Sequence, residues 1–276
     1  MSPPAWTSLS AFGLLFAALQ LALQPRGKLA SQLTGTASML FALGSPTLEL
    51  QALPFLLPAL CLSLAIPLLP RHHQGWPGKL IALWALAASL HLLPGFAPLI
   101  WLDDFGRDGE ALLRWHYSKG LAALLLLWAL PPPPYGDDRA RRWRLLPLCL
   151  ALPLLAWLFG LAQPDPRWLP GAGLWLLGNL FLTVFAEEVF FRGWLQSGLR
   201  QALTAHPHAF PLAVLGSSLL FGLAHLPWGL SFAALSVLAG FYYGWMAGPQ
   251  RRLGMSICAH FLTNACILIL LDSPLG

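Results

Sequence analysis

Residues 185–192 read Phe-Ala-Glu-Glu-Val-Phe-Phe-Arg and lie near the end of a long apolar run. Each charged residue at the centre of a membrane helix costs about 2.5–3.5 kcal/mol on a translocon-type scale, so such residues are seldom kept without a task. On a helix, Glu188 and Arg192 are four residues apart, share a face and can pair. Glu187 lies about 100° round the helix axis from Glu188. The stretch therefore predicts one carboxylate held by a partner and another available for chemistry.

The composition around this stretch is that of a membrane protein. The chain has 276 residues, of which 57% are hydrophobic and only 10% are charged, with a mean hydropathy of +0.64. Apolar stretches of about 17–25 residues recur between short polar loops, whereas the alternating segments of a transmembrane β-barrel are absent. We therefore expect an all-α polytopic membrane protein, a bundle of about eight to ten transmembrane helices with a polar site within the membrane.

The apolar runs give the expected positions of the spans. The first run has no Lys or Arg before it, so it lacks the basic region of a cleavable signal peptide and is expected to be a retained span. The expected spans are 6–24, 30–47, 51–70, 80–102, 114–133, 144–162, 172–193, 209–226, 230–248 and 253–271.

Loop charges orient these spans. If the loops are assigned alternately to the two sides, most of the 16 Lys and Arg residues fall on one side, which the positive-inside rule places in the cytoplasm. The net charge of +5 is scattered through loops and forms no basic face, so no nucleic-acid partner is expected. We expect an integral, multi-pass protein of the bacterial inner (plasma) membrane.

The segment 131–144, rich in proline and arginine, is the expected domain boundary. Residues 1–134 are expected to form amino-terminal transmembrane helices of unknown role. Residues 135–276 contain nearly all the polar residues of the membrane spans and are expected to form the catalytic helical core.

Three polar clusters fall within this second part. The first is Glu187-Glu188 with Arg192, the second runs from Phe221 to His225, and the third joins His260 to Asn264. The last pair is four residues apart and therefore shares one helix face. Such groups are expected to face the bundle interior or a water-filled cavity rather than lipid.

Hydrolysis is the chemistry that these residue types favour. A carboxyl group in a low-dielectric cavity has a raised pKa and can take a proton from water near neutral pH. We expect Glu187 to be the general base, aided by His225. An imidazole and an amide offer N–H donors to an oxyanion, the role expected of His260 and Asn264.

The motif order Glu-Glu-x-x-x-Arg, Phe-x-x-x-His and His-x-x-x-Asn resembles the CAAX prenyl endopeptidases and bacteriocin-processing proteins, the CPBP or Abi family that includes the Ras-converting endopeptidases. The resemblance covers roughly residues 172–271 and implies a glutamate-dependent intramembrane endopeptidase. It assigns catalytic roles to Glu187, His225, His260 and Asn264. The supporting motif residues are Glu188, Arg192 and Phe221. A membrane-anchored or lipid-modified substrate, cut near its terminus, is implied, as in peptide maturation or removal of a carboxyl-terminal sorting tail.

Other hydrolase chemistries remain open. Glu187, His225 and His260 could ligate zinc with an open fourth position. However, no His-Glu-x-x-His stretch occurs, and the third motif suits hydrogen-bond donation, so a metal-independent reaction without cofactor is favoured. A serine hydrolase is disfavoured, because Ser217 and Ser218 lie seven or more residues from His225 and no Gly-x-Ser-x-Gly elbow is present.

Two non-enzymatic functions are the alternatives, namely a proton-coupled transporter and a membrane scaffold. The polar residues gather in one carboxyl-terminal group without an inverted pair of broken helices, which counts against a transporter. The complete motif set counts against a scaffold. The predicted topology also carries a geometric condition. His225 falls near the outer end of its span, so it can meet Glu187 and His260 only if that span is tilted or broken, or if the catalytic cavity lies close to the middle of the membrane.

Overall fold

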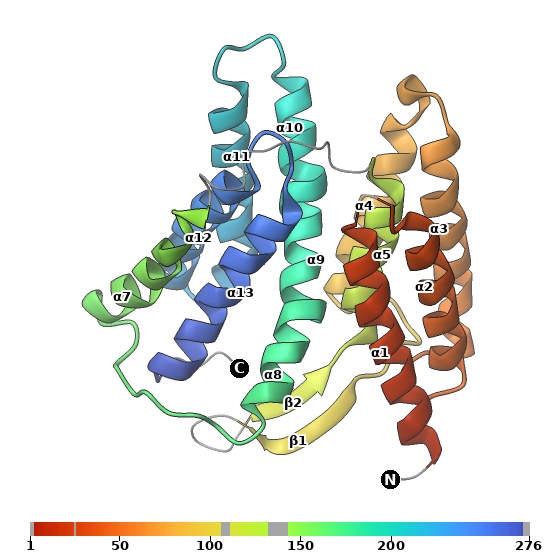
Figure 1. The fold of residues 1–276 in the computed structure, drawn as a ribbon, viewed down its shortest axis with the longest axis horizontal. Helices are drawn as coiled ribbons and strands as arrows, with labels where there is room; N and C mark the ends of the chain where they lie inside the picture. The colour runs from red at the N-terminus through yellow and green to blue at the C-terminus, as the bar shows by residue number, and fades with distance from the viewer. Residues whose placement is uncertain (1–2, 25, 106–110, 132–142, 273–276) are drawn as a thin grey trace. The chain divides into compact units, whose positions relative to one another are not determined.

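The computed structural model describes residues 3–24, 26–105, 111–131 and 143–272 (Figure 1). The chain divides into two compact units. The first comprises Met1–Trp101, Arg114–Pro132 and Phe181–Phe190, and the second comprises Leu102–Leu113, Pro133–Leu180 and Phe191–Gly276. The expected domain boundary at 134/135 lies outside the described residues and stays a prediction.

Helices dominate the described residues. The first unit contains α1 (Pro3–Ala22), α2 (Lys28–Leu43), α3 (Leu53–Ala65), α4 (Gly75–Ser89) and α5 (Tyr117–Ala129). The second contains α7 (Ala151–Leu158), α11 (Ala209–Ala224), α12 (Leu230–Ala247) and α13 (Leu253–Leu270). Short 3₁₀ turns occur at Leu50–Ala52, Ile66–Leu68, Arg71–His73, Leu146–Leu150 and Leu226–Trp228.

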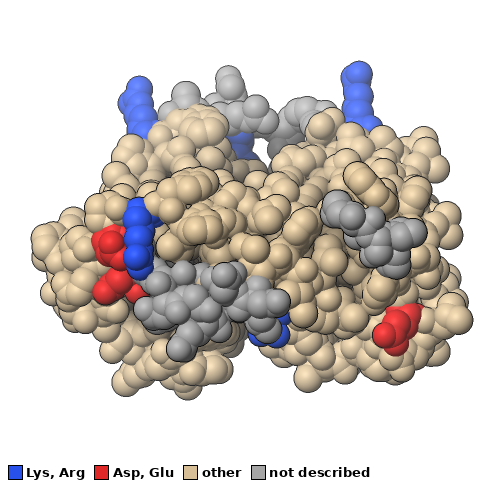
Figure 2. All heavy atoms as spheres, turned by 90° about the horizontal axis from the view of Figure 1, so that it is seen from below, with Lys and Arg blue, Asp and Glu red and all other residues tan. Residues whose placement is uncertain are grey.

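The helix lengths and compositions confirm an all-α polytopic membrane protein. Among the described residues, four helices are long and apolar enough to cross a membrane: Leu50–Leu68, Ala172–Ala202, Leu230–Ala247 and Leu253–Leu270. Shorter apolar helices occur at Trp6–Ala22, Tyr117–Ala129, Leu146–Leu158 and Ala209–Ala224. Figure 2 shows one face, on which few charged side chains interrupt an uncharged surface.

One expected span is wrong in part. The sequence predicts a single span at 80–102, but α4 ends at Ser89 and the chain forms a hairpin of β1 (Leu99–Phe105) and β2 (Ala111–Trp115). Pro94 and Pro98 explain the change, because proline removes a helix hydrogen bond and biases the preceding residue toward extended backbone. Gly95 between them has φ 82°, a left-handed value that glycine adopts readily.

Helix α5 forms the core of the first unit, with nearly every residue buried. Polar links attach it to its neighbours: Trp128 Nε1 donates to Ser31 Oγ at 2.9 Å, and Ser31 Oγ donates to the Ala18 carbonyl oxygen at 2.8 Å. The Tyr117 hydroxyl lies 2.7 Å from the Ser38 hydroxyl. Serine and tryptophan hydrogen bonds of this kind hold membrane helices together where burial of apolar surface adds little.

Two histidines stack beside the amino-terminal end of α5. The rings of His91 and His116 are 3.8 Å apart between centroids and tilted by 30°. Burial, followed by the charges of Lys119 and Arg114, lowers the pKa of His91 to about 4. Burial, then the neighbouring His91 and the same two cations, lowers the pKa of His116 to about 3. Both rings are therefore neutral at pH 7.

A single helix, Ala172–Ala202, carries the first motif (Figure 1). It consists of α8 (Ala172–Gly178), a π-helical segment (Asn179–Val184), α9 (Phe185–Glu188), a second π-helical segment (Val189–Gln196) and α10 (Ser197–Ala202). The two glutamates thus lie on a short α-helical turn between two π-helical segments. Such segments are rare and occur frequently at functional sites.

Helices α11 and α12 of the second unit pack through glycines. A Cβ atom placed on Gly222 would lie 2.3 Å from Val237 Cγ2 and 2.8 Å from the Ala233 carbonyl oxygen. A Cβ on Gly240 would lie 3.1 Å from the Ser218 Cα atom. Small residues let membrane helices approach this closely, and the contact fixes α11, which ends one residue before His225.

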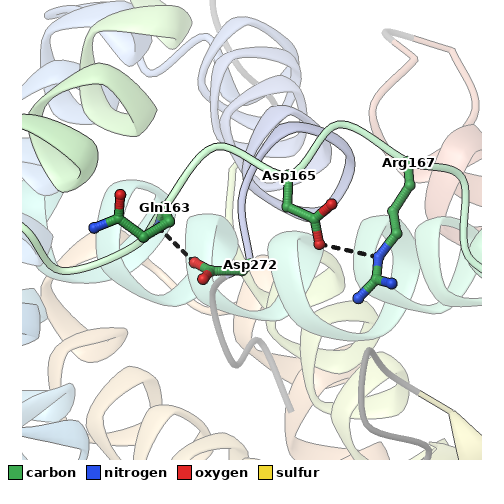
Figure 3. Close-up of polar contacts among 4 residues, drawn as sticks. All are labelled: Gln163, Asp165, Arg167 and Asp272. Atoms are coloured by element: carbon green, nitrogen blue, oxygen red, sulfur yellow. Dashed lines mark hydrogen bonds and ion pairs between the residues drawn. The ribbon is translucent and has the colours of Figure 1, made fainter.

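The carboxyl-terminal end of α13 is held by the segment 163–167, shown in Figure 3. The backbone N–H groups of Asp165 and Arg167 donate to the carbonyl oxygens of Leu270 and Ile269 at 2.9 and 3.0 Å. The Gln163 N–H donates to Asp272 Oδ1 at 2.5 Å, and Arg167 Nε lies 3.1 Å from Asp165 Oδ2. The two backbone bonds satisfy carbonyl groups that a helix end leaves without partners in its own helix, and they attach the segment to the helix that carries the third motif.

Candidate active site

The first motif is largely buried. Glu188 is 0% exposed and Arg192 is 1% exposed, whereas Glu187 is half-buried. The shared face of Glu188 and Arg192 was inferred from α-helical spacing, but the residues between them lie in a π-helical segment, where the register differs. The ion pair between them stays a prediction.

Arg192 contacts α11 through its guanidinium group. Its Nη1 donates to Ser217 Oγ at 2.8 Å, and Ser217 Oγ donates to the Phe191 carbonyl oxygen at 3.1 Å. The guanidinium carbon also lies 5.3 Å from the ring centroid of Phe221, within cation–π range. The Ser217 hydroxyl is thus part of a structural contact with a buried cation.

His225 lies directly after the last residue of α11, at the turn Leu226–Trp228. Its Nδ1 is 2.8 Å from the Phe221 carbonyl oxygen. Since a carbonyl oxygen only accepts, Nδ1 carries the proton, and in the neutral imidazole the lone pair is then on Nε2. The bond therefore leaves Nε2 as the nitrogen that can accept a proton.

His260 is buried in α13, with 4% of its surface exposed. Its ring stacks on that of Tyr243 from α12, at 4.3 Å between centroids and 14° between planes. The ring of Phe221 lies 5.8 Å from the His260 ring and 4.5 Å from the His225 ring. One aromatic side chain thus contacts both motif histidines, which lie 35 residues apart in the sequence.

Asn264 has a partner that sequence reasoning missed. Its Nδ2 donates to Asn179 Oδ1 at 3.2 Å, and both side chains are half-buried. Gln196 lies on the same helix as Asn179, Ala172–Ala202, and its Nε2 donates to the Gly244 carbonyl oxygen at 3.2 Å. A signal for both residues exists in the sequence, because uncharged polar residues inside a membrane helix commonly hydrogen-bond across helices.

The second unit therefore contains three of the four expected catalytic residues, together with the supporting residues Arg192 and Phe221. His225 and His260 meet at Phe221, and Asn264 lies one turn beyond His260 on α13. Glu187 belongs to the first unit. That its carboxylate faces the two imidazoles stays a prediction.

A zinc site formed by Glu187, His225 and His260 is the alternative that the sequence leaves open. Among the residues that the structure describes, no three His, Cys, Asp or Glu side chains are grouped in a way that could hold a metal ion. Metal-independent hydrolysis stays a prediction.

Comparison with known proteins bears on this region of the chain. The family model of the type II CAAX prenyl endopeptidase Rce1-like proteins matches residues 169–266, a range that includes all three motifs. This match confirms the resemblance inferred from the motifs. No curated protein and no solved structure matches the chain.

Proposed function

We propose that this chain, which carries an Rce1-like region of the CPBP family at residues 169–266, is an intramembrane endopeptidase that cuts a membrane-anchored or lipid-modified protein or peptide near its terminus. The family match supports CAAX-type protease activity, a membrane-associated protein substrate and an integral membrane location. The observation that carries the proposal is the contact of Phe221 with both His225 and His260 inside the matched region.

Water activation is the first step of the proposed reaction. Glu187 takes a proton from a water molecule as general base, and the water oxygen attacks the scissile carbonyl carbon. The bond from His225 Nδ1 to the Phe221 carbonyl oxygen supports a role for Nε2 as an acceptor that orients the same water. The proton then passes to the leaving amine as the peptide bond breaks.

Oxyanion stabilisation is the second requirement. An N–H of His260 and an N–H of Asn264 donate to the oxygen that becomes negative in the tetrahedral intermediate. Both side chains lie on one face of α13, and both contact residues of other helices, which supports a preorganised pair of donors. The buried Glu188 and Arg192 are proposed to fix the helix that carries the base.

A cleavage assay with a matched carboxylate control tests this proposal. Purified protein in lipid vesicles is given two reporters, a farnesylated peptide with a CAAX terminus and an unlipidated peptide with a membrane anchor. Glu187→Gln should lower the cleavage rate by about 10²–10⁴ while the fold is retained, because it removes the general base. Glu49→Gln changes an exposed glutamate and should cut like the wild type.

Two outcomes would overturn the assignment. If Glu187→Gln cleaves at the wild-type rate, Glu187 is not the base. The protease function itself is wrong if the wild type cuts neither reporter and if mass spectrometry detects no peptide that it releases from host membranes. A chelator titration on the wild type separates the chemistries, because only a metal enzyme loses activity.

A further inference from the structure

We infer that Asn179 is a positioning residue of this site: its side-chain oxygen holds the Asn264 amide in the orientation that oxyanion stabilisation requires. The inference rests on the proposed function. Asn179 lies outside all three motifs, eight residues before Glu187 in the same continuous helix. It is the first residue of the π-helical segment Asn179–Val184.

The contact that carries the inference is a side-chain hydrogen bond between residues 85 positions apart in the sequence. Asn264 Nδ2 donates to Asn179 Oδ1 at 3.2 Å. A carboxamide has two N–H donors on its nitrogen and a carbonyl acceptor, so this bond uses one donor of Asn264 and leaves the second for another acceptor. In the observed arrangement the bond directs one N–H of the Asn264 amide toward Asn179 and thereby orients the second.

Direction matters because the terminal torsion of asparagine is broad and roughly two-fold. Without a partner the Asn264 amide can turn over and present its oxygen, instead of an N–H, to a developing negative charge. Oxyanion stabilisation depends on donors that are oriented before the reaction begins. The Asn179 oxygen, on a neighbouring helix, is the acceptor that supplies this orientation.

The other proposed donor is fixed in a parallel way. His260 stacks on Tyr243 of α12, whereas Asn264 binds Asn179 of the helix Ala172–Ala202. Each donor on α13 therefore contacts a side chain from a different helix. A hydrogen bond that served only to join helices would affect stability alone, and this difference can be measured.

The test is a double-mutant cycle on turnover, with the reporter that the wild type cleaves. Asn179→Leu removes the acceptor at similar volume and should lower kcat about tenfold to a hundredfold with KM changed less than about twofold, since Asn179 contacts Asn264 and not the substrate. Asn264→Ala should lower kcat at least as much. The double variant should fall no further than Asn264→Ala, because Asn179 acts through that amide.

Two more variants keep the result interpretable. Ser197→Ala is the control, since its hydroxyl donates to the Arg192 carbonyl oxygen of its own helix, and it should keep the wild-type kcat. Asn179→Asp retains an oxygen acceptor and should turn over faster than Asn179→Leu. It also provides a folded comparison if the leucine variant does not fold.

Three results would overturn the inference while the protease function stands. They are a wild-type kcat for Asn179→Leu, losses that multiply in the double variant, and an Asn179→Asp variant no faster than Asn179→Leu. A wild type that cleaves no substrate would instead remove the proposed function, and this inference with it.

Discussion

Two adjacent serines on α11 offer a sharp test of how Arg192 is held. Ser217 and Ser218 are both 0% exposed, yet their hydroxyl groups have different partners. Ser217 Oγ accepts a hydrogen bond from Arg192 Nη1 at 2.8 Å, which joins α11 to the helix Ala172–Ala202. Ser218 Oγ donates to the Val214 carbonyl oxygen at 2.6 Å, within its own helix. Replacing each serine by alanine therefore removes the same atom from two different environments.

The expected magnitudes differ because only one of the two bonds involves a charge. Hydrogen bonds between membrane helices contribute about 0.6 kcal/mol on average, with a maximum near 1.7 kcal/mol, whereas hydrogen bonds to charged groups contribute about 1.5–3 kcal/mol. For Ser217→Ala we expect a loss of about 1.5 kcal/mol, roughly tenfold in the unfolding equilibrium. For Ser218→Ala we expect less than about 0.5 kcal/mol, since its bond is local and alanine favours the helix.

Reversible unfolding in mixed detergent micelles, titrated with SDS, gives the free energy of unfolding for both variants. In a background where the exposed Cys61 and the half-buried Cys258 and Cys266 are replaced by alanine, the buried free thiol of Cys149 reports unfolding through its reaction with a thiol-specific fluorophore. Equal losses for the two serines, or a larger loss for Ser218→Ala, would refute the argument that Ser217 stabilises a buried guanidinium. Partial rescue of Ser217→Ala by Ser217→Thr would support it, because threonine restores the hydroxyl.

Two further predictions concern packing and pH. Gly222→Ala should lower the free energy of unfolding by about 1–3 kcal/mol, because its Cβ overlaps α12. A Cβ atom on Gly198 would meet no atom within 4 Å, so Gly198→Ala should leave the free energy of unfolding unchanged or raise it. Equal SDS midpoints for the Gly222→Ala and Gly198→Ala variants would contradict this prediction. The pKa values of His91 and His116 lie below the ordinary 6.5, so the unfolded chain binds protons more readily, and stability should fall as pH drops from about 6.5 toward 4. Thermal unfolding between pH 7.5 and 5 should show this slope, and the double change His91→Gln/His116→Gln should flatten it; an unchanged slope would contradict the assignment.

The sequence allowed good predictions wherever polar residues interrupt apolar runs. Such residues are costly in a membrane, and their position therefore carries information. The spans predicted at 209–226, 230–248 and 253–271 correspond to helices Ala209–Ala224, Leu230–Ala247 and Leu253–Leu270. The family match covers the three motifs that the sequence singled out.

Features that depend on distant contacts or on backbone register were missed. Asn179 was one polar residue in an apolar run, and its partner lies 85 residues away, so no local pattern identified the pair. The π-helical segments beside Glu187 change the register that α-helical spacing assumes. The hairpin that begins at Leu99 was hidden by its apolar composition, although Pro94 and Pro98 in the same run were a warning.

The bonds that hold α13 limit how this helix can move. Asp165 and Arg167 bind the last carbonyl groups of this helix, and Asn179 binds Asn264 little more than one turn earlier. Because α13 is hydrogen-bonded both at its carboxyl-terminal end and at Asn264, it resists translation along its own axis. Such a translation would break the two backbone bonds and the Asn264–Asn179 bond together. For the proposed protease we therefore expect any movement of α13 during turnover to be a tilt of the helix rather than a shift along its axis.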